Sequence, residues 1–172
     1  MSRAHSFLPV AGRGASVLIL GSMPGRASLA AGQYYAHPRN LFWRIMTEIC
    51  GGAAALSYPG RLRLLKANGI ALWDVLDSCV RPGSADSAIE RATMRANDLV
   101  SFFRTHPGIR TVLFNGAKAE DCYRRCVLPA LPAACAGLNY RRLPSTSPAH
   151  ASVPYAGKLS AWKTAVGACR NK

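Results

Sequence analysis

The sequence predicts an α/β protein, a three-layer α/β/α sandwich around a central, mainly parallel four-stranded sheet. Four segments with the length of strands are rich in apolar residues, and helical patterns separate them along the chain. The first three segments show little alternation of polar and apolar residues, which is typical of strands buried on both faces of a sheet. A helical crossover returns the chain to the end of the sheet where the preceding strand began, so this order favours parallel pairing.

The expected strands cover residues 16–20, 70–75, 109–114 and 140–143. Apolar residues recur at helical spacing between and after these strands, and Gly69 supplies a helix end before the second one. In chain order the helical patterns are Phe42, Ile45, Met46 and Ile49; residues 61–68; Leu99, Phe102 and Phe103; Ala119, Cys122, Tyr123, Cys126 and Val127; and Leu159, Trp162, Val166 and Cys169.

The chain has the size and composition of one compact domain. Its 172 residues are 49% hydrophobic, which is enough for one sizeable core. We therefore expect a single domain over residues 1–172, with a flexible N-terminal segment over residues 1–14. No apolar stretch approaches the ~20 residues that cross a membrane, and the first residues lack the apolar run of a signal peptide. A soluble, cytoplasmic protein without a membrane partner is expected.

A basic excess points to a polyanionic partner. The chain has 22 Lys and Arg residues against 8 Asp and Glu, and 17 of the basic residues are arginine. The planar arginine side chain suits phosphates, and a positive field speeds encounter with nucleic acid. A high-GC genome would also enrich arginine, alanine and glycine, so charge favours nucleic acid as the partner without deciding the matter alone.

The six cysteines form no CxxC pair. Cys122 and Cys126 fall on a helical stripe of the kind that is buried, and Cys50, Cys79 and Cys135 stand alone. We therefore predict reduced, mostly buried thiols, no metal site and no cofactor.

Polar or turn-forming residues follow each predicted strand. The first strand leads into GSMPGRASLAAGQYYAHPRNLFW, the second into Asp74 and DSCVRPGSADS, the third into Asn115 and Gly116, and the fourth into PSTSPAHA. Each piece has a plain explanation as a turn or a strand terminator. Because parallel strands place these exits on one edge of the sheet, together they predict a cleft.

The first exit lacks both phosphate-binding fingerprints, GxxxxGK[ST] and GxGxxG, which disfavours a nucleoside triphosphate. It supplies instead the rings of Tyr34 and Tyr35, the amide of Asn40 and backbone N–H groups beside glycine. These groups suit a pocket for a planar heterocycle.

The motifs GSMPG, QYYAHPRNLFW, LWDVL, FNG and STSPAH together resemble the uracil-DNA glycosylase superfamily. AHPRNLFW is similar to a run in the mismatch-specific uracil-DNA glycosylases, and the whole set more closely resembles the hypoxanthine-DNA glycosylase branch, also called DNA-deoxyinosine glycosylase. The resemblance runs from the first strand to the C-terminal helix. It implies the same three-layer fold and a base-excision repair hydrolase that flips a deaminated base out of DNA and breaks its N-glycosidic bond.

Other branches of this superfamily place a catalytic Asp or Asn where Met23 stands, and His or Asn where Ser145 stands. Methionine cannot orient water, and the resemblance implies that Asn40 is catalytic, holding the water that attacks C1′ of the sugar. An amide cannot be a general base at neutral pH, but it can accept a hydrogen bond from water. The structural alternative for Asn40 is the N-cap of a helix that starts at Leu41.

The resemblance implies that Tyr35 stacks on the flipped base, while Tyr34 is either wall or core. Asp74 is expected to accept N1–H of hypoxanthine, and Asn115 to contact the base from the third strand. The plain alternatives are a helix or turn cap for Asp74 and a strand-ending turn for Asn115. The expected base-binding residues are Tyr35, Ser22, Met23, Asp74 and Asn115.

Residues 145–150 resemble the loop that enters the minor groove and fills the hole left by the flipped nucleotide. Prolines and small side chains make a stiff wedge at little ordering cost, and a plain turn before the last helix is the alternative. The expected DNA-binding and wedge residues are Ser145, Thr146, Ser147, Pro148, Ala149 and His150.

No lysine lies in these motifs, so a Schiff-base lyase step has no candidate nucleophile. A monofunctional, metal-free glycosylase is expected. His37 is either a strut for its loop or an acid, and the strut is favoured.

Excision of uracil from G:U mismatches is the first alternative, because uracil and hypoxanthine both present an N–H beside a carbonyl. A non-catalytic DNA-binding module would explain the charge and the aromatic residues, but not a loop that combines Tyr35 with Asn40. A small-molecule nucleotide hydrolase needs neither the basic excess nor a groove wedge. We expect a monomer whose partner is DNA that contains a deaminated base.

Overall fold

The computed structural model describes residues 3–83 and 85–170 and has the predicted α/β architecture. Its central sheet has four strands in the order β3-β2-β6-β7, and every neighbouring pair is parallel. β2 and β3 are buried along their whole length, as the lack of polar alternation predicted. The strands are β2 (Val17–Gly21), β3 (Ile70–Asp74), β6 (Thr111–Asn115) and β7 (Asn139–Leu143).

The register of the sheet brings the carboxyl ends of its strands to one edge. Gly21 at the end of β2 pairs with Asp74 at the end of β3. Asn115 at the end of β6 pairs with Leu143 at the end of β7. The four exits noted in the sequence therefore begin side by side.

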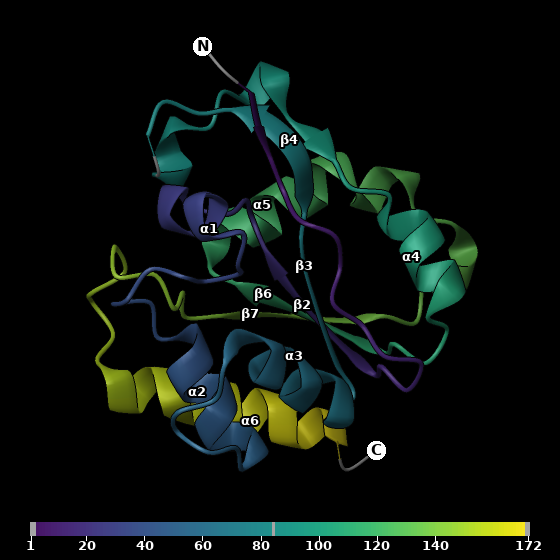
Figure 1. Cartoon of the computed structure of the whole chain (residues 1–172). Coiled ribbons are helices and arrows are strands. Elements are labelled where there is room, and N and C mark those ends of the chain that lie inside the picture. Colours follow the sequence, from purple (N-terminus) through teal and green to yellow (C-terminus); the bar gives the residue numbers. More distant parts are fainter. Residues whose placement is uncertain (1–2, 84, 171–172) are drawn as a thin grey trace.

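Helices cover both faces of the sheet, which gives three layers (Figure 1). One face carries α2 (Phe42–Cys50), α3 (Tyr58–Ala67) and α6 (Tyr155–Arg170). The other face carries α1 (Arg26–Ala31), α4 (Leu99–Thr105) and α5 (Ala117–Cys126). All of the predicted helical patterns lie within these helices, apart from residues at their ends; α1 was not predicted.

A second, antiparallel sheet was also not predicted. Its strands β1 (Arg3–His5), β4 (Leu76–Val80) and β5 (Arg95–Ala96) pair in the order β1-β4-β5. They are short and come from distant parts of the chain, so no local pattern marks them. Single-turn 3-10 helices lie at Asp86–Ala88, Arg91–Thr93, Leu128–Ala130 and Ala133–Cys135.

The N-terminal part of the chain differs from the flexible segment expected over residues 1–14. β1 pairs with β4, and Val10 forms an isolated bridge with Leu72 of β3. The Tyr34 hydroxyl also donates a hydrogen bond to the carbonyl oxygen of Leu8 (3.1 Å). Residues 3–10 are therefore tied to the domain by partners that lie far away in the sequence.

The cysteines are less buried than predicted. Cys79 and Cys122 are buried, whereas the other thiols are partly exposed. Cys126 and Cys169 lie at the edges of their helical stripes, where a residue is only partly covered by the sheet. The expectation of mostly buried thiols is wrong for Cys50, Cys126, Cys135 and Cys169.

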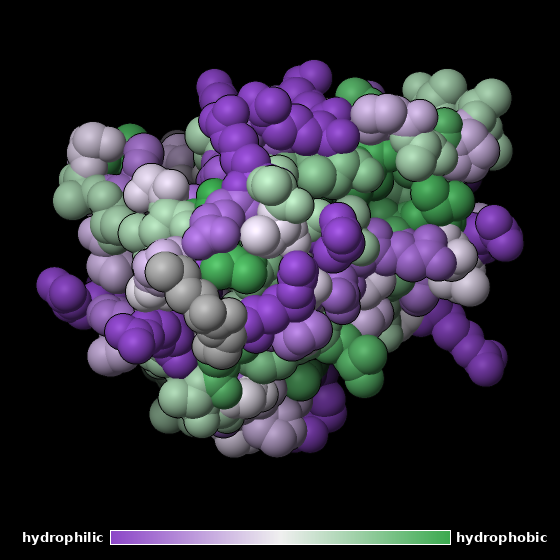
Figure 2. All heavy atoms as spheres, turned by 90° about the horizontal axis from the view of Figure 1, so that it is seen from above, coloured by the Kyte–Doolittle hydropathy of each residue, from purple (hydrophilic) through white to green (hydrophobic). Residues whose placement is uncertain are grey.

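The surface is mixed in character. On the face seen in Figure 2, hydrophilic side chains are spread widely, with smaller apolar areas between them. The large apolar side chains that are exposed within the described ranges are Leu8, Leu128 and Tyr140. Of the helices in the described part of the chain, none is both long and apolar enough to cross a membrane.

Trp162 joins α6 to the loop that follows β7. Its side chain is fully buried, and its ring meets Phe42 of α2 edge to face with centroids 6.1 Å apart. Its indole N–H donates a hydrogen bond to the carbonyl oxygen of Pro144 (2.9 Å). One side chain thus connects two helices to the edge of the sheet where the exits lie.

We expect Trp162→Ala to lower the free energy of unfolding by about 3–5 kcal/mol, because it removes a large buried ring and leaves a cavity. Lys163→Ala, at the next and exposed position of α6, should change it by less than about 0.5 kcal/mol. Urea denaturation followed by circular dichroism measures both values. Equal losses in the two variants would contradict a packing role for Trp162.

Candidate active site

A cavity of about 600 Å³ lies at the carboxyl edge of the central sheet. Its lining draws on all four strand exits, as the sequence predicted for a cleft at this edge. The structure therefore brings together every residue that the sequence analysis assigned to the site. These residues are Ser22, Met23, Tyr35, Asn40, Asp74, Asn115, Ser145, Thr146, Ser147, Pro148, Ala149 and His150.

Gly21 is the point where the end of β2 meets two side chains of the cavity. A Cβ atom on Gly21 would lie 2.3 Å from Asp74 Oδ1 and 2.9 Å from the Tyr35 hydroxyl oxygen. Any side chain at this position would displace one or both of them. The first glycine of GSMPG is thus required for close approach, in addition to any role in the turn.

Tyr35 has an uncommon backbone conformation. Its φ of 54° is the only positive value among the described non-glycine residues. Its ring stacks on Phe42, with centroids 4.1 Å and planes 28° apart. Burial raises the pKa of Tyr35 well above its usual range, so its hydroxyl stays protonated. A strained backbone at an aromatic residue of a cavity is typical of a functional position.

Two neighbouring residues of this loop, Tyr34 and His37, had alternative roles in the sequence. Tyr34 is a core residue, only 3% exposed. His37 is partly exposed; its Nδ1 accepts a hydrogen bond from the Arg39 backbone N–H (3.1 Å), and its carbonyl oxygen accepts one from Asn40 (2.8 Å). These bonds are those of a strut that shapes the loop.

Asn40 lies where the loop enters α2. Its Oδ1 accepts a hydrogen bond from the Phe42 backbone N–H (3.0 Å), so the side chain caps the first turn from the position before the N-cap residue, Leu41. The helix begins at Phe42, one residue later than the expected start at Leu41. Because an amide oxygen has two lone pairs and the amide nitrogen carries two hydrogens, capping uses only part of the hydrogen-bonding capacity of Asn40.

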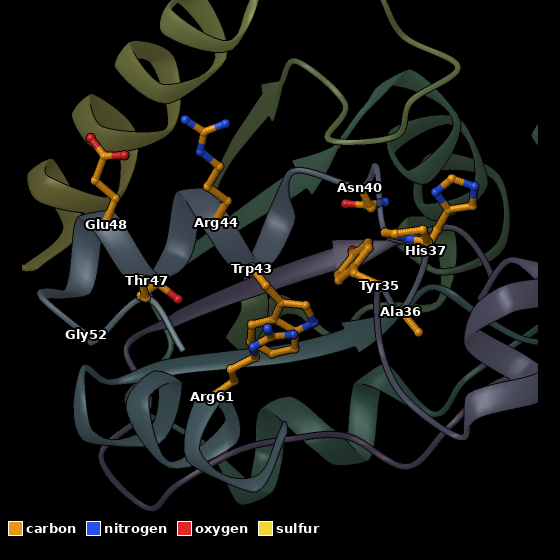
Figure 3. Close-up of a pocket in the computed structure, with 12 residues that line it drawn as sticks. Tyr35, Ala36, His37, Asn40, Trp43, Arg44, Thr47, Glu48, Gly52 and Arg61 are labelled. Carbon is orange, nitrogen blue, oxygen red and sulfur yellow. The ribbon is translucent and has the colours of Figure 1, made fainter. Parts of the chain in front are cut away.

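A second cavity, of about 630 Å³, adjoins the first on the side of α2, and Tyr35, His37 and Asn40 line both. Figure 3 shows Asn40 and Tyr35 at one end of this second cavity, with Arg44 and Glu48 on α2 beyond them. The Arg44 guanidinium lies 3.9 Å from the centre of the Tyr155 ring. This cavity was not predicted from the sequence.

Asn115 clamps the loop after β7 to the end of β6. Its Nδ2 donates to Thr146 Oγ1 (2.9 Å), and its Oδ1 accepts from the Thr146 backbone N–H (2.8 Å). Thr146 is fully buried, so its side chain does not belong to an exposed wedge as expected. The Leu41 N–H donates to the Thr146 carbonyl oxygen (3.0 Å), which attaches the same loop to the start of α2.

The rest of this loop is more accessible. Ala149 is exposed, and Pro148 and His150 are partly exposed. Ser145 Oγ accepts from the Ser147 N–H and Ser147 Oγ accepts from the Ala149 N–H, each at 3.2 Å. These short-range bonds stiffen the loop from within.

Lys158 supports the loop from α6. Its Nζ donates to the carbonyl oxygen of His150 (2.6 Å), and the residue is only 2% exposed. Burial lowers the pKa of Lys158. The site motifs contain no lysine, and Lys158 lies eight residues beyond His150 on a helix, so only the folded chain reveals this contact.

Two charged residues that the sequence analysis did not assign lie beside the first exit. Ser22 Oγ donates to Asp86 Oδ1 (2.8 Å), and Arg81 donates to the carbonyl oxygen of Pro24 (2.5 Å). Arg81 Nη1 lies 3.9 Å from Asp86 Oδ1, and the Arg81 side chain is 1% exposed. Both residues belong to the quoted exit DSCVRPGSADS, but nothing in that pattern showed which polar residues turn inward.

Asp74 is the deeply buried acid of the cavity. It is 3% exposed, and its Oδ2 makes no hydrogen bond within the described part of the chain. Burial and then the nearby Asp86 raise the pKa of Asp74 to about 8, while Arg81 acts in the opposite direction. Its carboxyl group is therefore largely neutral at pH 7, when it can donate as well as accept a hydrogen bond.

The chain is similar to known proteins over most of its length. The sequence model of the uracil DNA glycosylase superfamily matches residues 9–166. The hypoxanthine DNA glycosylase of Methanosarcina barkeri (strain Fusaro / DSM 804) is 37% identical over 120 residues, which are 69% of this chain and 75% of that protein. The hypoxanthine DNA glycosylase of Methanosarcina acetivorans is 38% identical over 118 residues, 68% of this chain and 73% of that protein.

A solved structure agrees with these similarities. It is a solution NMR structure of a protein from Methanosarcina acetivorans that is described as a candidate uracil DNA glycosylase. It matches with a TM-score of 0.79 and 32% identity, over 96% of this chain and 97% of that chain. Because the family match extends over the central sheet and every loop that lines the cavity, the chain belongs to the uracil DNA glycosylase superfamily.

Proposed function

We propose that this protein is a DNA-repair glycosylase that hydrolyses the N-glycosidic bond of deoxyinosine and releases hypoxanthine. The observation that carries the proposal is the convergence of Tyr35, Asn40 and Asp74 on one cavity, in a chain similar over two thirds of its length to proteins named hypoxanthine DNA glycosylase. A cavity of about 600 Å³ has room for a purine and part of its sugar.

Bond cleavage leaves positive character on the sugar and negative charge on the departing base. Asn40 borders both cavities and has hydrogen-bonding capacity beyond its cap to Phe42, so it can accept a hydrogen bond from a water and direct its oxygen at C1′. Met23, in the slot where relatives of other branches carry an acid or an amide, contributes only apolar surface and is 6% exposed.

The base is recognised by its ring face and by its polar edge. Tyr35 is held by its stacking on Phe42, which fixes the plane of its ring for a flipped base. Asp74 ends β3 and Asn115 ends β6, the strands on either side of β2, and both supply polar groups for the edge of the base. Since Asn115 already holds Thr146 with both of its polar atoms, its contact to the base must share those atoms.

Base flipping is assigned to the loop of residues 145–150. Its accessible part, from Pro148 to His150, is the portion that enters the space vacated by the flipped nucleotide. Asn115 and Lys158 hold the loop from two sides, so little of its order has to be gained on binding DNA. The net charge of +14 supplies the general attraction to phosphates.

The reaction is proposed to stop at the abasic site. A lyase step needs an amine that can attack C1′, and no lysine is among the described residues that line the cavity. Lys158 instead donates to a backbone carbonyl beneath the loop. A monomer that acts on chromosomal DNA in the cytoplasm fits this role.

Release of free base from labelled duplexes tests the function directly. We expect hypoxanthine to be released from deoxyinosine faster than uracil from deoxyuridine, and no release of adenine, whose edge lacks the N–H beside a carbonyl. Chromatography of the released bases measures all three. Faster release of uracil would move the protein to the uracil-excising alternative, and release of no base would leave a DNA-binding module.

Substitution of Asn40 separates its chemical role from its cap. Asn40→Ala should slow release of hypoxanthine by about 10²-fold or more, the scale of a lost transition-state hydrogen bond, and should also cost about 1 kcal/mol of stability through the lost cap. Asn40→Ser keeps an oxygen for capping but cannot reach as far, so it should lose activity while its melting temperature stays near that of the wild type. Normal turnover of Asn40→Ser would show that Asn40 is only a cap.

The wedge is tested by comparing duplex with single-stranded DNA. Replacing Pro148, Ala149 and His150 by glycine should slow excision of deoxyinosine opposite cytosine far more than excision from a single strand, because only the duplex must be opened. Lys158→Met, which leaves the loop sequence intact but removes its support, should shift the ratio of the two rates in the same direction. Equal losses on both substrates would contradict the wedge assignment.

A further inference from the structure

Among the described residues, two carboxyl groups line the cavity, those of Asp74 and Asp86, and their surroundings differ. Asp86 accepts a hydrogen bond from Ser22 Oγ (2.8 Å) and lies 3.9 Å from Arg81 Nη1. Its side chain is 48% exposed, so water also solvates it. Asp74 is 3% exposed, and its Oδ2 has no partner among the described residues.

We propose that Asp74 is a general acid whose neutral carboxyl group gives its proton to the departing purine, while Asp86 carries the negative charge of the pair. The proposal rests on the glycosylase function proposed above and adds a proton donor to it. It also revises the expectation that Asp74 only accepts a hydrogen bond from the base.

Burial and charge both favour this division of roles. An ionised Asp74 would be a second negative charge in a cavity that already holds Asp86, and it would have to give up its hydration. It would also repel the negative charge that develops on the base. A neutral carboxyl group avoids both costs and presents a donor where the charge appears.

The groups around Asp74 act in opposite directions on its ionisation. The negative charge of Asp86 opposes ionisation of Asp74, and the positive charge of Arg81 favours it. Arg81 itself contacts Asp86 and the carbonyl oxygen of Pro24. The adjacent strand β2 and the next strand β6 contribute neutral groups at this edge, namely Gly21, Ser22 and Asn115. The remaining titratable groups that line the cavity within the described ranges are Arg26, Tyr34, Tyr35, His37 and His150.

The proposed step balances as follows. The bond between C1′ and N9 breaks, and its electron pair goes to the purine. The proton on the Asp74 carboxyl group moves to a basic ring nitrogen of the purine, which leaves as neutral hypoxanthine, and Asp74 becomes a carboxylate. The water held by Asn40 adds to C1′ and loses a proton to solvent, and a proton from solvent restores Asp74.

This role favours purines over uracil. A purine has basic ring nitrogens, apart from the one that is bonded to the sugar, which an acid can protonate. Uracil has no such nitrogen and departs as an anion. Loss of the acid should therefore slow release of hypoxanthine far more than release of uracil, and this difference separates a general acid from a residue that only shapes the cavity.

The main experiment measures single-turnover release of hypoxanthine between about pH 6 and pH 9. For the wild type, the rate should fall about tenfold per pH unit above a midpoint near 8, because Asp74 ionises there. Asp74→Asn keeps the shape of the side chain but has no acidic proton. Its rate of release should be about 10²-fold lower at neutral pH and should lack this fall at alkaline pH, the alkaline limb of the profile. The lactam of deoxyinosine also ionises in alkali, but it does so equally for both proteins.

Two matched variants sharpen the comparison. Asp77→Asn, at an exposed position of β4, should leave the rate and its pH profile unchanged. Asp86→Asn removes the negative neighbour that raises the pKa of Asp74. In this variant the rate should therefore begin to fall at a lower pH than in the wild type. A limb that persists in Asp74→Asn would overturn the proposal.

A second measurement does not depend on activity. Carbon-13 NMR of the side-chain carboxyl groups, with Asp74→Asn for assignment, should show Asp74 titrating with a midpoint near 8. The melting temperature gives the same information: an acid with a raised pKa favours folding less as pH rises from its unfolded value towards 8. The stabilisation of Asp74→Asn relative to the wild type should therefore grow between about pH 5 and pH 8.

The outcomes distinguish this proposal from the function on which it rests. An ordinary acidic midpoint for Asp74, with normal release of hypoxanthine, overturns the general acid and leaves the glycosylase intact. Failure of the wild type to release hypoxanthine from any DNA overturns the proposed function, and the acid role with it. A midpoint near 8 together with a limb that disappears in Asp74→Asn supports both.

Discussion

The parallel register of the central sheet is the constraint on which the candidate site depends. Gly21 pairs with Asp74 and Asn115 pairs with Leu143, so the four strands end level at one edge. A slip of one residue in β3 would turn the Asp74 side chain to the opposite face of the sheet. Hydrogen bonding along buried strands is costly to break, and it therefore positions the polar residues of the cavity more firmly than contacts among the loops themselves could.

Several residues of the cavity to which we assign a chemical role also stabilise the fold with the same atoms. Asn40 caps α2 through Oδ1, and Asn115 joins two strand exits through both polar atoms of its amide. Such double use orients the side chain before a substrate arrives, which lowers the cost of ordering it in the transition state. Asp74 is the opposite case: its buried Oδ2 has no partner within the described ranges, so the fold gains no hydrogen bond from this atom. Its presence is easier to explain by chemistry than by stability.

The loop of residues 145–150 is held at several points that lie close together in space. Asn115 and Leu41 both bind Thr146, Lys158 binds His150, and Trp162 binds Pro144. These anchors come from β6, from the residue before α2, and from α6. The accessible residues of the loop are therefore positioned by its buried ones, which supports the proposed wedge without a long element of secondary structure.

Periodicity was sufficient to predict the four parallel strands, the main helices and the edge of the sheet where the site lies. Continuous apolar runs and helical spacing are patterns of neighbouring residues, so they can be recognised without knowledge of the tertiary structure. The motifs were sufficient to predict the cavity lining, including Tyr35, Asn40 and Asp74. Neither predicted the sheet of β1, β4 and β5, whose partners are distant in sequence.

The tertiary structure alone decided which polar residues turn inward and what surrounds them. It buried Thr146, placed Lys158 against the loop of residues 145–150, and set Arg81 beside Asp86. It left Asp74 without a contacting cation in the described part of the chain. Desolvation and Coulomb energy depend on distances between segments that the sequence does not relate to one another. The protonation state of an acid, and hence its chemical role, can therefore be inferred only once those segments have been brought together.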